Sequence, residues 1–404
     1  MAASRSIGRS FRSVWLSVMV SSAGDGMFLT AFPLLAAILT RDPVLIAGVT
    51  IASRLPWLVF SLFTGALADR MDRRRLMIGA DLIRFVIVGL LGAAILTDTV
   101  NIWMLYASAF LLGSCETLHV NAAQGLIPAI VKQEDLLEAN ARFASGQIVA
   151  AQFIGPPLGV VMFNASMSLP FLADAATFAG SAALIAKVPN EHAVEKPTTK
   201  IFADIKEGIR YTIETTSLRR LTEILAVVNF FYFAANSLLV LYNEDLLGGG
   251  KATFTALSVG AASGTVASRF FLEKITQRLG TTRTLEVSLW AWAAATVGLA
   301  LATNPLTAII SHVILGIGSG WWIALNTTLR QQITPTRMLG RMNAVSRTVT
   351  WGIVPFGALF GGVSARIFGL RGPFIISAVV MVSYAIFSRQ LLKPVREAVN
   401  NLQQ

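Results

Sequence analysis

The sequence predicts an all-α membrane protein with twelve transmembrane helices in two six-helix, pseudo-symmetric bundles. Three observations lead to this prediction. Apolar runs of about 20 residues, the length that a helix needs to cross a bilayer, recur about twelve times along the chain. Charged residues make up only 14% of the 404 residues, whereas soluble proteins carry about 25%. A polar stretch in the middle divides the apolar runs into two sets of six.

The apolar runs account for most of a chain that is 54% hydrophobic. An α-helix satisfies every backbone polar group within its own segment, which the interior of a bilayer requires. We expect the spans at Val14–Leu39, Val44–Ala68, Leu76–Leu96, Ile102–Ile127, Ala144–Phe163, Leu169–Val188, Leu221–Leu241, Phe254–Ile275, Leu285–Ala302, Leu306–Leu325, Val349–Ile367 and Phe374–Leu392.

Basic residues set the expected orientation of these spans. The net charge is +11, and the basic residues occupy short loops instead of alternating with aromatic residues, so no nucleic-acid partner is expected. If Met1 is cytoplasmic, the outside turns hold only Arg41, Lys251, Arg366 and Arg371. This asymmetry is the positive-inside pattern, and it predicts that both termini are cytoplasmic.

The longest polar stretch, Pro189–Ser217, predicts the boundary between the two bundles. A four-residue apolar spacing within it is typical of an amphipathic helix on the inner membrane surface. We expect an N-terminal bundle at 1–188, a cytoplasmic linker at 189–218, a C-terminal bundle at 219–393 and a cytoplasmic tail at 394–404. The apolar stripe of the linker consists of Ile201, Ile205, Ile209 and Ile213.

A dense charged motif, Gly65-Ala-Leu-Ala-Asp69-Arg70-Met-Asp72-Arg73-Arg74-Arg75, joins the second and third spans. It cannot stay in hydrocarbon, so it must lie at one membrane face. The spacing G-x-x-x-D-R-x-x-R-R resembles the signature between the second and third helices of the major facilitator superfamily of secondary transporters, which often has Gly where this chain has Asp72. The resemblance implies an inner gate; the alternative is a stop-transfer signal only. The gate residues would be Gly65, Asp69, Arg70, Arg73 and Arg74.

The resemblance covers nearly the whole chain. Ser53–Trp57, Gly113–Thr117, Phe153–Gly159 and Trp351–Gly357 are similar to segments of the bacterial exporter branch that includes enterobactin exporters and mycobacterial multidrug efflux pumps. This resemblance implies the major facilitator fold, alternating access around a midplane cavity, and a place in the bacterial cytoplasmic (inner) membrane.

Ionisable residues within the spans are the proton-coupling candidates, because a charged side chain in a bilayer costs roughly 2.5–3.5 kcal/mol on insertion scales. Asp25 stands between two glycines and either exchanges a proton or caps a broken helix. Glu116 shares a helix face with His119, so the pair either relays a proton or forms an internal hydrogen bond. Arg84 follows Asp81 by three residues, and the two can neutralise each other.

Arg54 is the remaining candidate for proton coupling. No acidic residue lies near it in the sequence, so its partner must come from another helix, and we expect Asp25 or Glu116.

The fifth span carries Gly155-Pro156-Pro157-Leu158-Gly159, which resembles the antiporter signature of exporters. Proline removes backbone hydrogen bonds and kinks a helix, and glycines four apart let another helix approach closely. We therefore assign an export hinge to Gly155, Pro156 and Gly159, with a packing motif as the alternative. Gly260-x-x-x-Gly264 in the eighth span is the expected partner from the other half.

The second half is poor in acidic residues within its spans, and amide and aromatic side chains take their place. Such a wall suits a bulky lipophilic ligand, although the tryptophans could also be interfacial anchors. The candidates for the substrate cavity are His119, Asn121, Asn229, Trp321, Trp322 and Asn326.

Nucleotide-binding and hydrolase motifs are absent, and the single cysteine, Cys115, excludes a cysteine-cluster metal site. We expect no cofactor, no metal and no enzymatic activity. The sequence predicts a monomeric secondary transporter that exports amphipathic or lipophilic, drug-like small molecules by proton antiport. The alternatives are a dedicated exporter of a siderophore or secondary metabolite, and a non-transporting regulator or scaffold.

Overall fold

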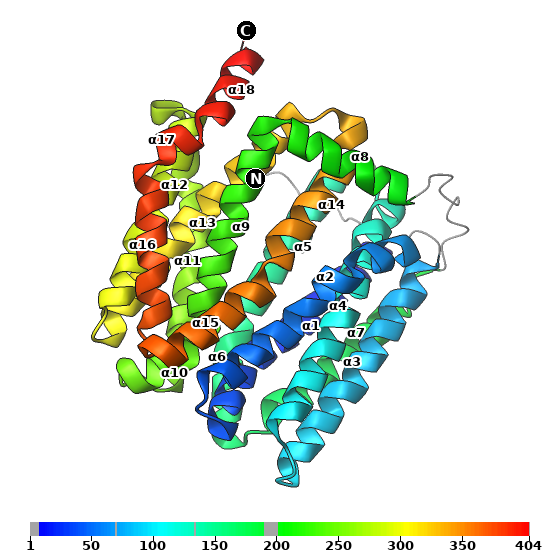
Figure 1. Cartoon of the computed structure of the whole chain (residues 1–404). Coiled ribbons are helices and arrows are strands. Elements are labelled where there is room, and N and C mark those ends of the chain that lie inside the picture. Colours follow the sequence, from blue (N-terminus) through cyan, green and yellow to red (C-terminus); the bar gives the residue numbers. More distant parts are fainter. Residues whose placement is uncertain (1–7, 69–70, 133–134, 190–200, 404) are drawn as a thin grey trace. The chain divides into compact units, whose positions relative to one another are not determined.

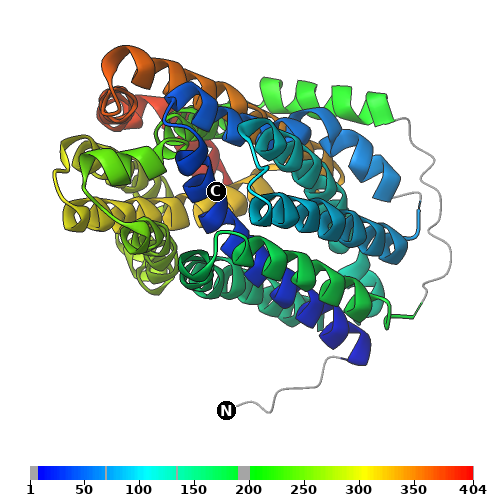
Figure 2. The ribbon, with the colours of Figure 1, turned by 90° about the horizontal axis from the view of Figure 1, so that it is seen from below.

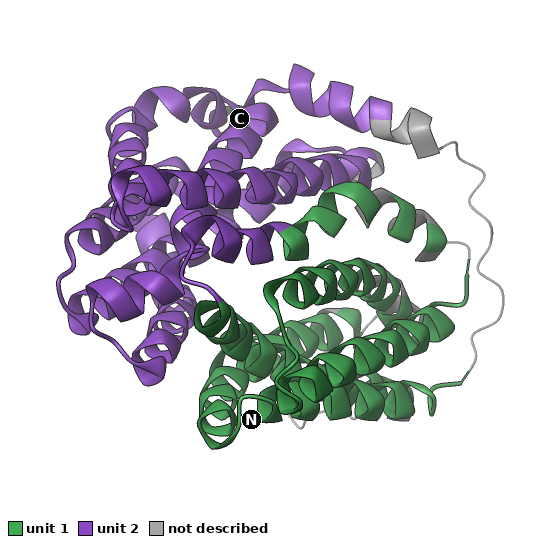
Figure 3. Ribbon diagram, turned by 60° about the horizontal axis from the view of Figure 1, so that its bottom comes forward, with its two compact units in different colours: residues 1–39, 52–198 green, residues 40–51, 199–404 purple. Residues whose placement is uncertain are grey.

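The computed structural model describes residues 8–68, 71–132, 135–189 and 201–403. These residues are almost entirely helical and include no strand (Figure 1). The chain divides into two compact units (Figure 3). Unit 1 comprises Met1–Leu39 and Ala52–Thr198, and unit 2 comprises Thr40–Ile51 and Thr199–Gln404. The division in the middle falls inside the expected linker, whereas residues 40–51, expected in the N-terminal bundle, belong to unit 2.

Unit 1 contains the helices of the first half, and α2 begins in unit 2 and continues into unit 1. A π-helical segment, Val149–Ile154, joins α5 to α6. The helices are α1 (Arg9–Leu39), α2 (Pro43–Ala68), α3 (Arg73–Leu96), α4 (Ile102–Ile130), α5 (Leu136–Ile148), α6 (Gly155–Ala165) and α7 (Leu169–Ile185).

Unit 2 contains the helices of the second half and the short helix that precedes them. A π-helical segment, Tyr242–Leu246, follows α10. The helices are α8 (Ile201–Glu214), α9 (Thr216–Asn236), α10 (Leu239–Leu241), α11 (Lys251–Leu279), α12 (Thr281–Leu301), α13 (Pro305–Ile333), α14 (Thr336–Gly352), α15 (Val354–Phe368), α16 (Gly372–Ile386), α17 (Ser388–Leu391) and α18 (Lys393–Gln403).

The helices follow the expected apolar runs. In the described part of the chain, seven helices are long and apolar enough to cross a membrane, and the bent pair Thr216–Asn236 and Leu239–Leu246 makes eight. The other expected runs are helical too: they lie on α4 and α11, and on the shorter apolar helices α7 and α16. The all-α architecture predicted from the sequence is therefore confirmed.

Polar side chains mark where several helices begin. The Asp72 carboxylate accepts a 3.1 Å hydrogen bond from the Arg75 backbone N–H at the start of α3. Asn101 accepts from Trp103 N and Met104 N at the start of α4. Asn304 accepts from Thr307 N at the start of α13. Each side chain satisfies a backbone donor that has no partner within its helix.

Helices α1, α3, α4 and α7 form the part of unit 1 that holds most of its buried charge. Helix α3 packs on both α4 and α7, and α1 packs on both α7 and α4 (Figures 1 and 2). Their contacts include an apolar cluster with Val14, Met77, Ala122 and Ile185. Because four helices meet there, side chains from segments far apart in the sequence can face one another.

Helix α8 exposes the two described members of the apolar stripe expected of the linker. Ile209 and Ile213 are 42% and 52% exposed, while the side chains of Ile201 and Ile205 lie outside the described part. Other residues of α8 contact unit 2: the Tyr211 hydroxyl donates to Ile333 O at 3.4 Å, and Glu207 pairs with Arg341. These polar contacts leave Ile209 and Ile213 exposed, as a helix lying on a membrane surface requires.

Candidate functional site

A buried polar cluster in unit 1 is centred on Asp81 of α3. Its carboxylate is fully buried and accepts a 2.6 Å hydrogen bond from the Ser181 hydroxyl of α7. His119 Nε2 of α4 lies 3.5 Å from Asp81 Oδ1, and Arg84 Nη1 lies 3.9 Å from the same oxygen. Three helices therefore surround one buried carboxylate with a hydroxyl, an imidazole and a guanidinium.

Arg84 is the buried cation of this cluster. Its guanidinium also lies over the ring of Phe178 on α7, 5.2 Å from the ring centroid, which is cation–π geometry. The expected pairing of Arg84 with Asp81 is confirmed, but the pair is not isolated, because His119 and Ser181 share the same carboxylate.

Glu116 belongs to a second polar group. Arg54 Nη1 of α2 lies 4.0 Å from its Oε2, and the indole N–H of Trp57 points at the same oxygen from 3.4 Å. The expectation that Arg54 pairs with Asp25 or Glu116 is therefore confirmed for Glu116. The Glu116 side chain is 43% exposed, so it remains accessible. The expected pairing of Glu116 with His119 is wrong, because His119 pairs with Asp81 instead.

Asp174 of α7 lies against α1 at Gly24, the residue before Asp25. A Cβ atom on Gly24 would overlap the Asp174 carboxylate and the Thr177 hydroxyl, so this glycine lets α7 approach next to Asp25. Asp174 is 1% exposed, and Thr177 Oγ1 lies 3.3 Å from its Oδ1. Among the described residues, no cation lies within ion-pair distance of Asp25 or Asp174.

Sequence reasoning missed Asp174 and treated Asp81 only as a partner of Arg84. The signal was present, since both are acids within expected apolar spans, the criterion that selected Asp25. The contacts of Asp81 with His119 and Ser181, however, join three helices and cannot be found from spacing along one of them.

The charged motif between α2 and α3 is described only in part. Asp69 and Arg70 lie outside the described residues, and Gly65 falls within α2. Arg73 is the first residue of α3. Arg74 donates to Ile185 O at 3.2 Å and to Ala186 O at 2.5 Å. This guanidinium therefore binds carbonyls at the C-terminal end of α7, where the helix dipole favours a positive charge.

The Gly-Pro motif packs within unit 1. A Cβ on Gly155 would lie 2.6 Å from Gly26 Cα, and one on Gly159 would lie 2.8 Å from Met27 O, so α6 rests directly on the backbone of α1. Pro156 follows the π-helical segment as a first-turn residue of α6. The motif was expected to pack on Gly260-x-x-x-Gly264 of the other half, and this expectation is wrong, because the motif packs on α1.

Gly260 and Gly264, which were expected to contact that motif, pack against α13 instead. Around Gly260 and Gly264 of α11, the nearest neighbours of an added Cβ belong to α13, including Ile309 and Val313. Both helices lie in unit 2.

The second-half cavity candidates are engaged within unit 2. Asn229 donates to Thr350 O at 2.7 Å. The Trp321 indole donates to Ser268 O at 2.9 Å. Asn326 accepts from Arg330 Nε at 3.0 Å, and Arg330 is a buried cation that sequence reasoning missed.

The expectation that Trp322 lines the substrate cavity is wrong. It is 0% exposed in an apolar core and packs on Trp292 with ring centroids 5.2 Å apart, so it offers no face to a ligand or to lipid. In unit 1, Asn121 donates to Thr64 Oγ1 at 2.9 Å.

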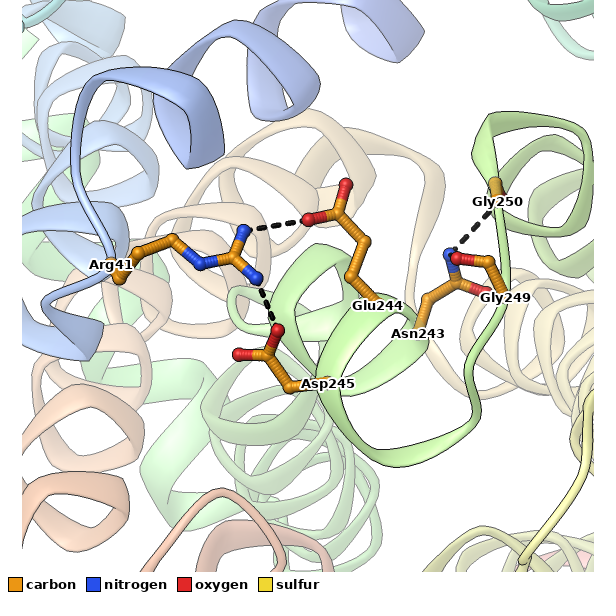
Figure 4. Close-up of polar contacts among 6 residues, drawn as sticks. All are labelled: Arg41, Asn243, Glu244, Asp245, Gly249 and Gly250. Atoms are coloured by element: carbon orange, nitrogen blue, oxygen red, sulfur yellow. Dashed lines mark hydrogen bonds and ion pairs between the residues drawn. The ribbon is translucent and has the colours of Figure 1, made fainter.

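A charged clasp joins the turn after α1 to the segment after α10, both in unit 2 (Figure 4). Arg41 Nη1 donates to Glu244 Oε2 at 2.6 Å, and Arg41 Nη2 donates to Asp245. Asn243 holds the following turn by donating to Gly249 O and Gly250 O (Figure 4). The hydrogen bond from Arg41 to Glu244 raises the pKa of the guanidinium above its usual value, with help from the charge of Asp245.

No group of three or more His, Cys, Asp or Glu side chains in the described ranges is placed to hold a metal ion. The buried cluster combines carboxylates, an imidazole and a guanidinium, whose chemistry is proton binding and charge pairing.

Several known proteins are similar to this chain over most of its length. A family model described as transmembrane secretion effector matches residues 6–403. Macrolide efflux protein A of Streptococcus pyogenes is 21% identical over 384 residues, which cover 93% of this chain and 94% of that protein. Multidrug efflux pump Tap of Mycolicibacterium fortuitum is 25% identical over 392 residues, 91% of this chain and 92% of the pump.

Two further similarities add to these. The staphyloferrin A transporter of Staphylococcus aureus is 23% identical over 372 residues, covering 87% of this chain and 90% of that transporter. Among solved structures, a mutant of the nucleoside transporter NupG superposes with a TM-score of 0.78 at 10% identity, covering 95% of this chain and 100% of the NupG chain. At that identity the similarity shows the fold alone.

Proposed function

Because the chain belongs to the transmembrane secretion effector family of the major facilitator superfamily, a family of exporters that cross the membrane several times, we propose that it exports amphipathic or lipophilic drug-like compounds in exchange for protons. Relatives named for macrolide and multidrug efflux support this substrate class. Macrolides are therefore the first compounds to test.

The buried cluster around Asp81 is the observation that carries the proposal of proton coupling. Ionised side chains are costly within membrane spans, so they are retained where they do work, such as carrying a proton. Asp81 is fully buried and Arg84 nearly so, and the buried Asp174 lies on the neighbouring helix α7. A non-transporting scaffold would gain nothing from such a group.

Glu116 supports a separate role in substrate binding. Its side chain is accessible, and Arg54 and Trp57 hold one of its oxygens. A carboxylate next to an indole offers a negative charge and an apolar face to an amphipathic ligand. We assign the coupling proton to Asp25 and its neighbours, and the first contact with the ligand to Glu116.

Transport would follow alternating access between the two six-helix halves, with Asp69, Arg70, Arg73 and Arg74 at the inner gate. We place a monomer in the bacterial cytoplasmic membrane with both termini inside. A reporter fused after Lys200 should then read cytoplasmic, and one fused at Asn304 external. A reversed reading would contradict this orientation.

The proposed activity is tested by efflux of a compound panel, with erythromycin and lipophilic cationic dyes, from a host that lacks its own pumps. Expression of the chain should lower accumulation, and a protonophore should abolish the effect. Glu116→Gln should raise accumulation again, whereas Asp98→Asn, at an exposed turn, should not. Efflux that is insensitive to the protonophore would exclude proton antiport.

Export of a siderophore is the second candidate, favoured by the similarity to the staphyloferrin A transporter. A panel that includes iron-free siderophores separates the two candidates. Export of a siderophore without export of any macrolide or dye would replace the drug-like substrate class.

A further inference from the structure

Helix α8 of unit 2 has no role in the transport cycle described above, but its position gives it a surface of its own. It ends at Glu214, and α9, part of the bent pair that is long and apolar enough to cross a membrane, begins at Thr216. Thr215 between them has an extended backbone, and the two helices run in clearly different directions (Figure 1). Because α9 enters the membrane directly after α8 ends, α8 lies at the membrane surface.

One face of α8 is fixed to the junction of α13 and α14. A Cβ on Gly208 would lie 3.0 Å from Arg341 O, so the backbone of α8 rests directly on α14. The Glu207 carboxylate pairs with the Arg341 guanidinium. The Tyr211 hydroxyl donates to Ile333 O, at the end of α13, at 3.4 Å. These contacts determine which face of α8 is turned away from the rest of unit 2.

The opposite face of α8 carries two basic and two apolar side chains. Ile209 and Ile213 are exposed, and so are Lys206 and Arg210. At 3.6 residues per turn, these four side chains fall within an arc of about 100°, with the isoleucines on one edge. Glu214, the other exposed residue in the described part of this helix, lies beyond the opposite edge. The face therefore combines apolar contact area with positive charge.

The positive charge of this face is left open to an external partner. Glu207 pairs with Arg341, and Glu223 pairs with the two basic residues of the first turn of α9. In the described part of the chain, neither Lys206 nor Arg210 has an acid within ion-pair distance. Uncompensated cations beside exposed isoleucines are complementary to a bilayer with anionic phospholipids, whose phosphate groups attract the cations and whose acyl chains accept the apolar side chains.

We propose that Lys206 and Arg210 bind the phosphate groups of anionic phospholipids, while the exposed isoleucines of α8 enter the boundary of the acyl chains. Through the contacts of Gly208 and Tyr211, the bound lipid stabilises the junction of α13 and α14. This inference goes beyond the proposed export, because it concerns the lipid and needs no substrate. It also goes beyond the expected place of α8 on the membrane, because it names the lipid and the residues that select it.

The number of charges sets the expected size of the effect. One lysine or arginine near an anionic membrane surface strengthens binding roughly fivefold. Loss of both Lys206 and Arg210 should therefore weaken binding of an anionic lipid roughly 25-fold. High salt should weaken it as well, because ions screen charges at a surface.

The test is the melting temperature of the full chain in detergent micelles to which phosphatidylglycerol or phosphatidylcholine is added. Phosphatidylglycerol should raise the melting temperature of the wild type more than phosphatidylcholine does. The double variant Lys206→Gln/Arg210→Gln should need roughly 25-fold more phosphatidylglycerol for the same rise. Lys274→Gln/Arg278→Gln is the matched control, since it removes an exposed basic pair of the same spacing at the end of α11. It should respond like the wild type.

Three results of this titration would overturn the proposal. An equal response of the wild type to both lipids would remove the preference for anionic headgroups. An equal loss in the two double variants would attribute the effect to net charge instead of to α8. The same rise with glycerol phosphate alone would make the site a binding site for free phosphate, without a role for the bilayer.

Spin labels test whether the face lies in the lipid. Ile213→Cys and Glu214→Cys, each in a Cys115→Ala chain, are labelled in vesicles of phosphatidylcholine with phosphatidylglycerol. The label at position 213 should collide more with oxygen, which dissolves in acyl chains, and the label at position 214 more with a water-soluble nickel complex. Equal access of the nickel complex to both labels would place the face in water and would overturn the insertion.

The link to the junction of α13 and α14 has its own variant. Glu207→Gln combined with Tyr211→Phe removes the polar contacts of α8 with that junction and leaves Lys206 and Arg210 in place. The label at position 213 should keep its depth in this variant, whereas the rise in melting temperature with phosphatidylglycerol should become smaller. A rise as large as that of the wild type would overturn the link. None of these measurements uses a substrate, so their outcome is independent of the proposed export.

Discussion

Arg41 and Glu244 lie 203 positions apart in the chain, yet they form a 2.6 Å ion pair that Asp245 completes from the other side of the guanidinium. Asn243, which precedes the two acids, is fully buried and fastens the next turn through its amide. The clasp therefore connects the turn after α1 to a segment whose backbone is held in place. Sequence analysis assigned Arg41 only to an outside turn.

The clasp should stabilise the protein modestly and in a salt-dependent way. Arg41 is half exposed, and pairs of this kind contribute about 0.2–1 kcal/mol each because water and ions screen them. Arg41→Gln should therefore lower the melting temperature in detergent at low salt, with a smaller difference at high salt. Exchanging the charges with Arg41→Glu and Glu244→Arg should recover part of the loss.

Arg366→Gln is the matched control, because Arg366 reaches Asp42 only at 4.0 Å and is more exposed. It should change the melting temperature less than Arg41→Gln. The raised pKa of Arg41 means that its contribution is fully present below the ordinary pKa of arginine and is lost only above it. Titration of Arg41 should therefore produce no change near neutral pH.

Asp81 should be the most sensitive residue of the buried cluster. Asp81→Asn would leave the Arg84 guanidinium buried with no carboxylate at ion-pair distance, and removing one partner of a buried pair costs about 3–5 kcal/mol. The measurement is thermal unfolding of the purified protein. Arg84→Gln in the same chain should restore part of the stability, because it removes the unpaired charge.

Asp72→Asn provides the comparison for Asp81→Asn. Asp72 caps α3 through a hydrogen bond from the Arg75 backbone and pairs at 3.6 Å with the exposed Arg75 guanidinium, and asparagine is an equally good capping residue. The variant should unfold close to the wild-type temperature. Equal losses for Asp72→Asn and Asp81→Asn would contradict the special place of the buried carboxylate.

The elements of the fold could be predicted from the sequence, and the partners of side chains could be predicted only in part. Long apolar runs and capping residues act within one segment, so the helices lie where they were expected. The partner of Arg54 was found because only two acids were considered, and Glu116 was one of them. His119 was paired wrongly, since a shared helix face says nothing about the neighbouring helix.

Helices that are apolar all round limit the prediction most. In such a helix the pattern does not tell which side faces a cavity, a neighbouring helix or lipid. Trp322 was expected at a ligand surface for this reason, but it is buried in the core. The same limit hid the contact of Gly155 with Gly26, which depends on how α6 is placed against α1.

Glu116 and Asp25 should respond differently to neutralisation. Glu116→Gln removes the negative charge next to Trp57 and Arg54 and should weaken binding of a macrolide, measured by quenching of tryptophan fluorescence in the purified protein. Asp25→Asn should keep this binding but abolish uphill transport driven by an imposed pH gradient. If Asp25→Asn vesicles still accumulate the compound on a pH gradient, the coupling site lies elsewhere.

The contact of α6 with α1 should tolerate no additional side-chain atom. A Cβ at Gly155 would lie 2.6 Å from Gly26 Cα, and one at Gly159 would lie 2.9 Å from Met27 Cα. These neighbours are backbone atoms that cannot rotate away, so the two helices would have to separate, and overpacking of this kind costs typically about 1–3 kcal/mol. Gly155→Ala and Gly159→Ala should therefore each lower the melting temperature and the transport rate.

Gly89→Ala is the control for this contact, because a Cβ there meets no atom within 4 Å. Gly89 lies within α3, where alanine is favoured over glycine by roughly 0.5–1 kcal/mol. This variant should keep or slightly raise the melting temperature and transport at the wild-type rate. If Gly155→Ala behaves like Gly89→Ala, the glycines of the motif are not needed for the close approach of α6 to α1. Loss of transport at the wild-type melting temperature would instead assign Gly155 to the export hinge.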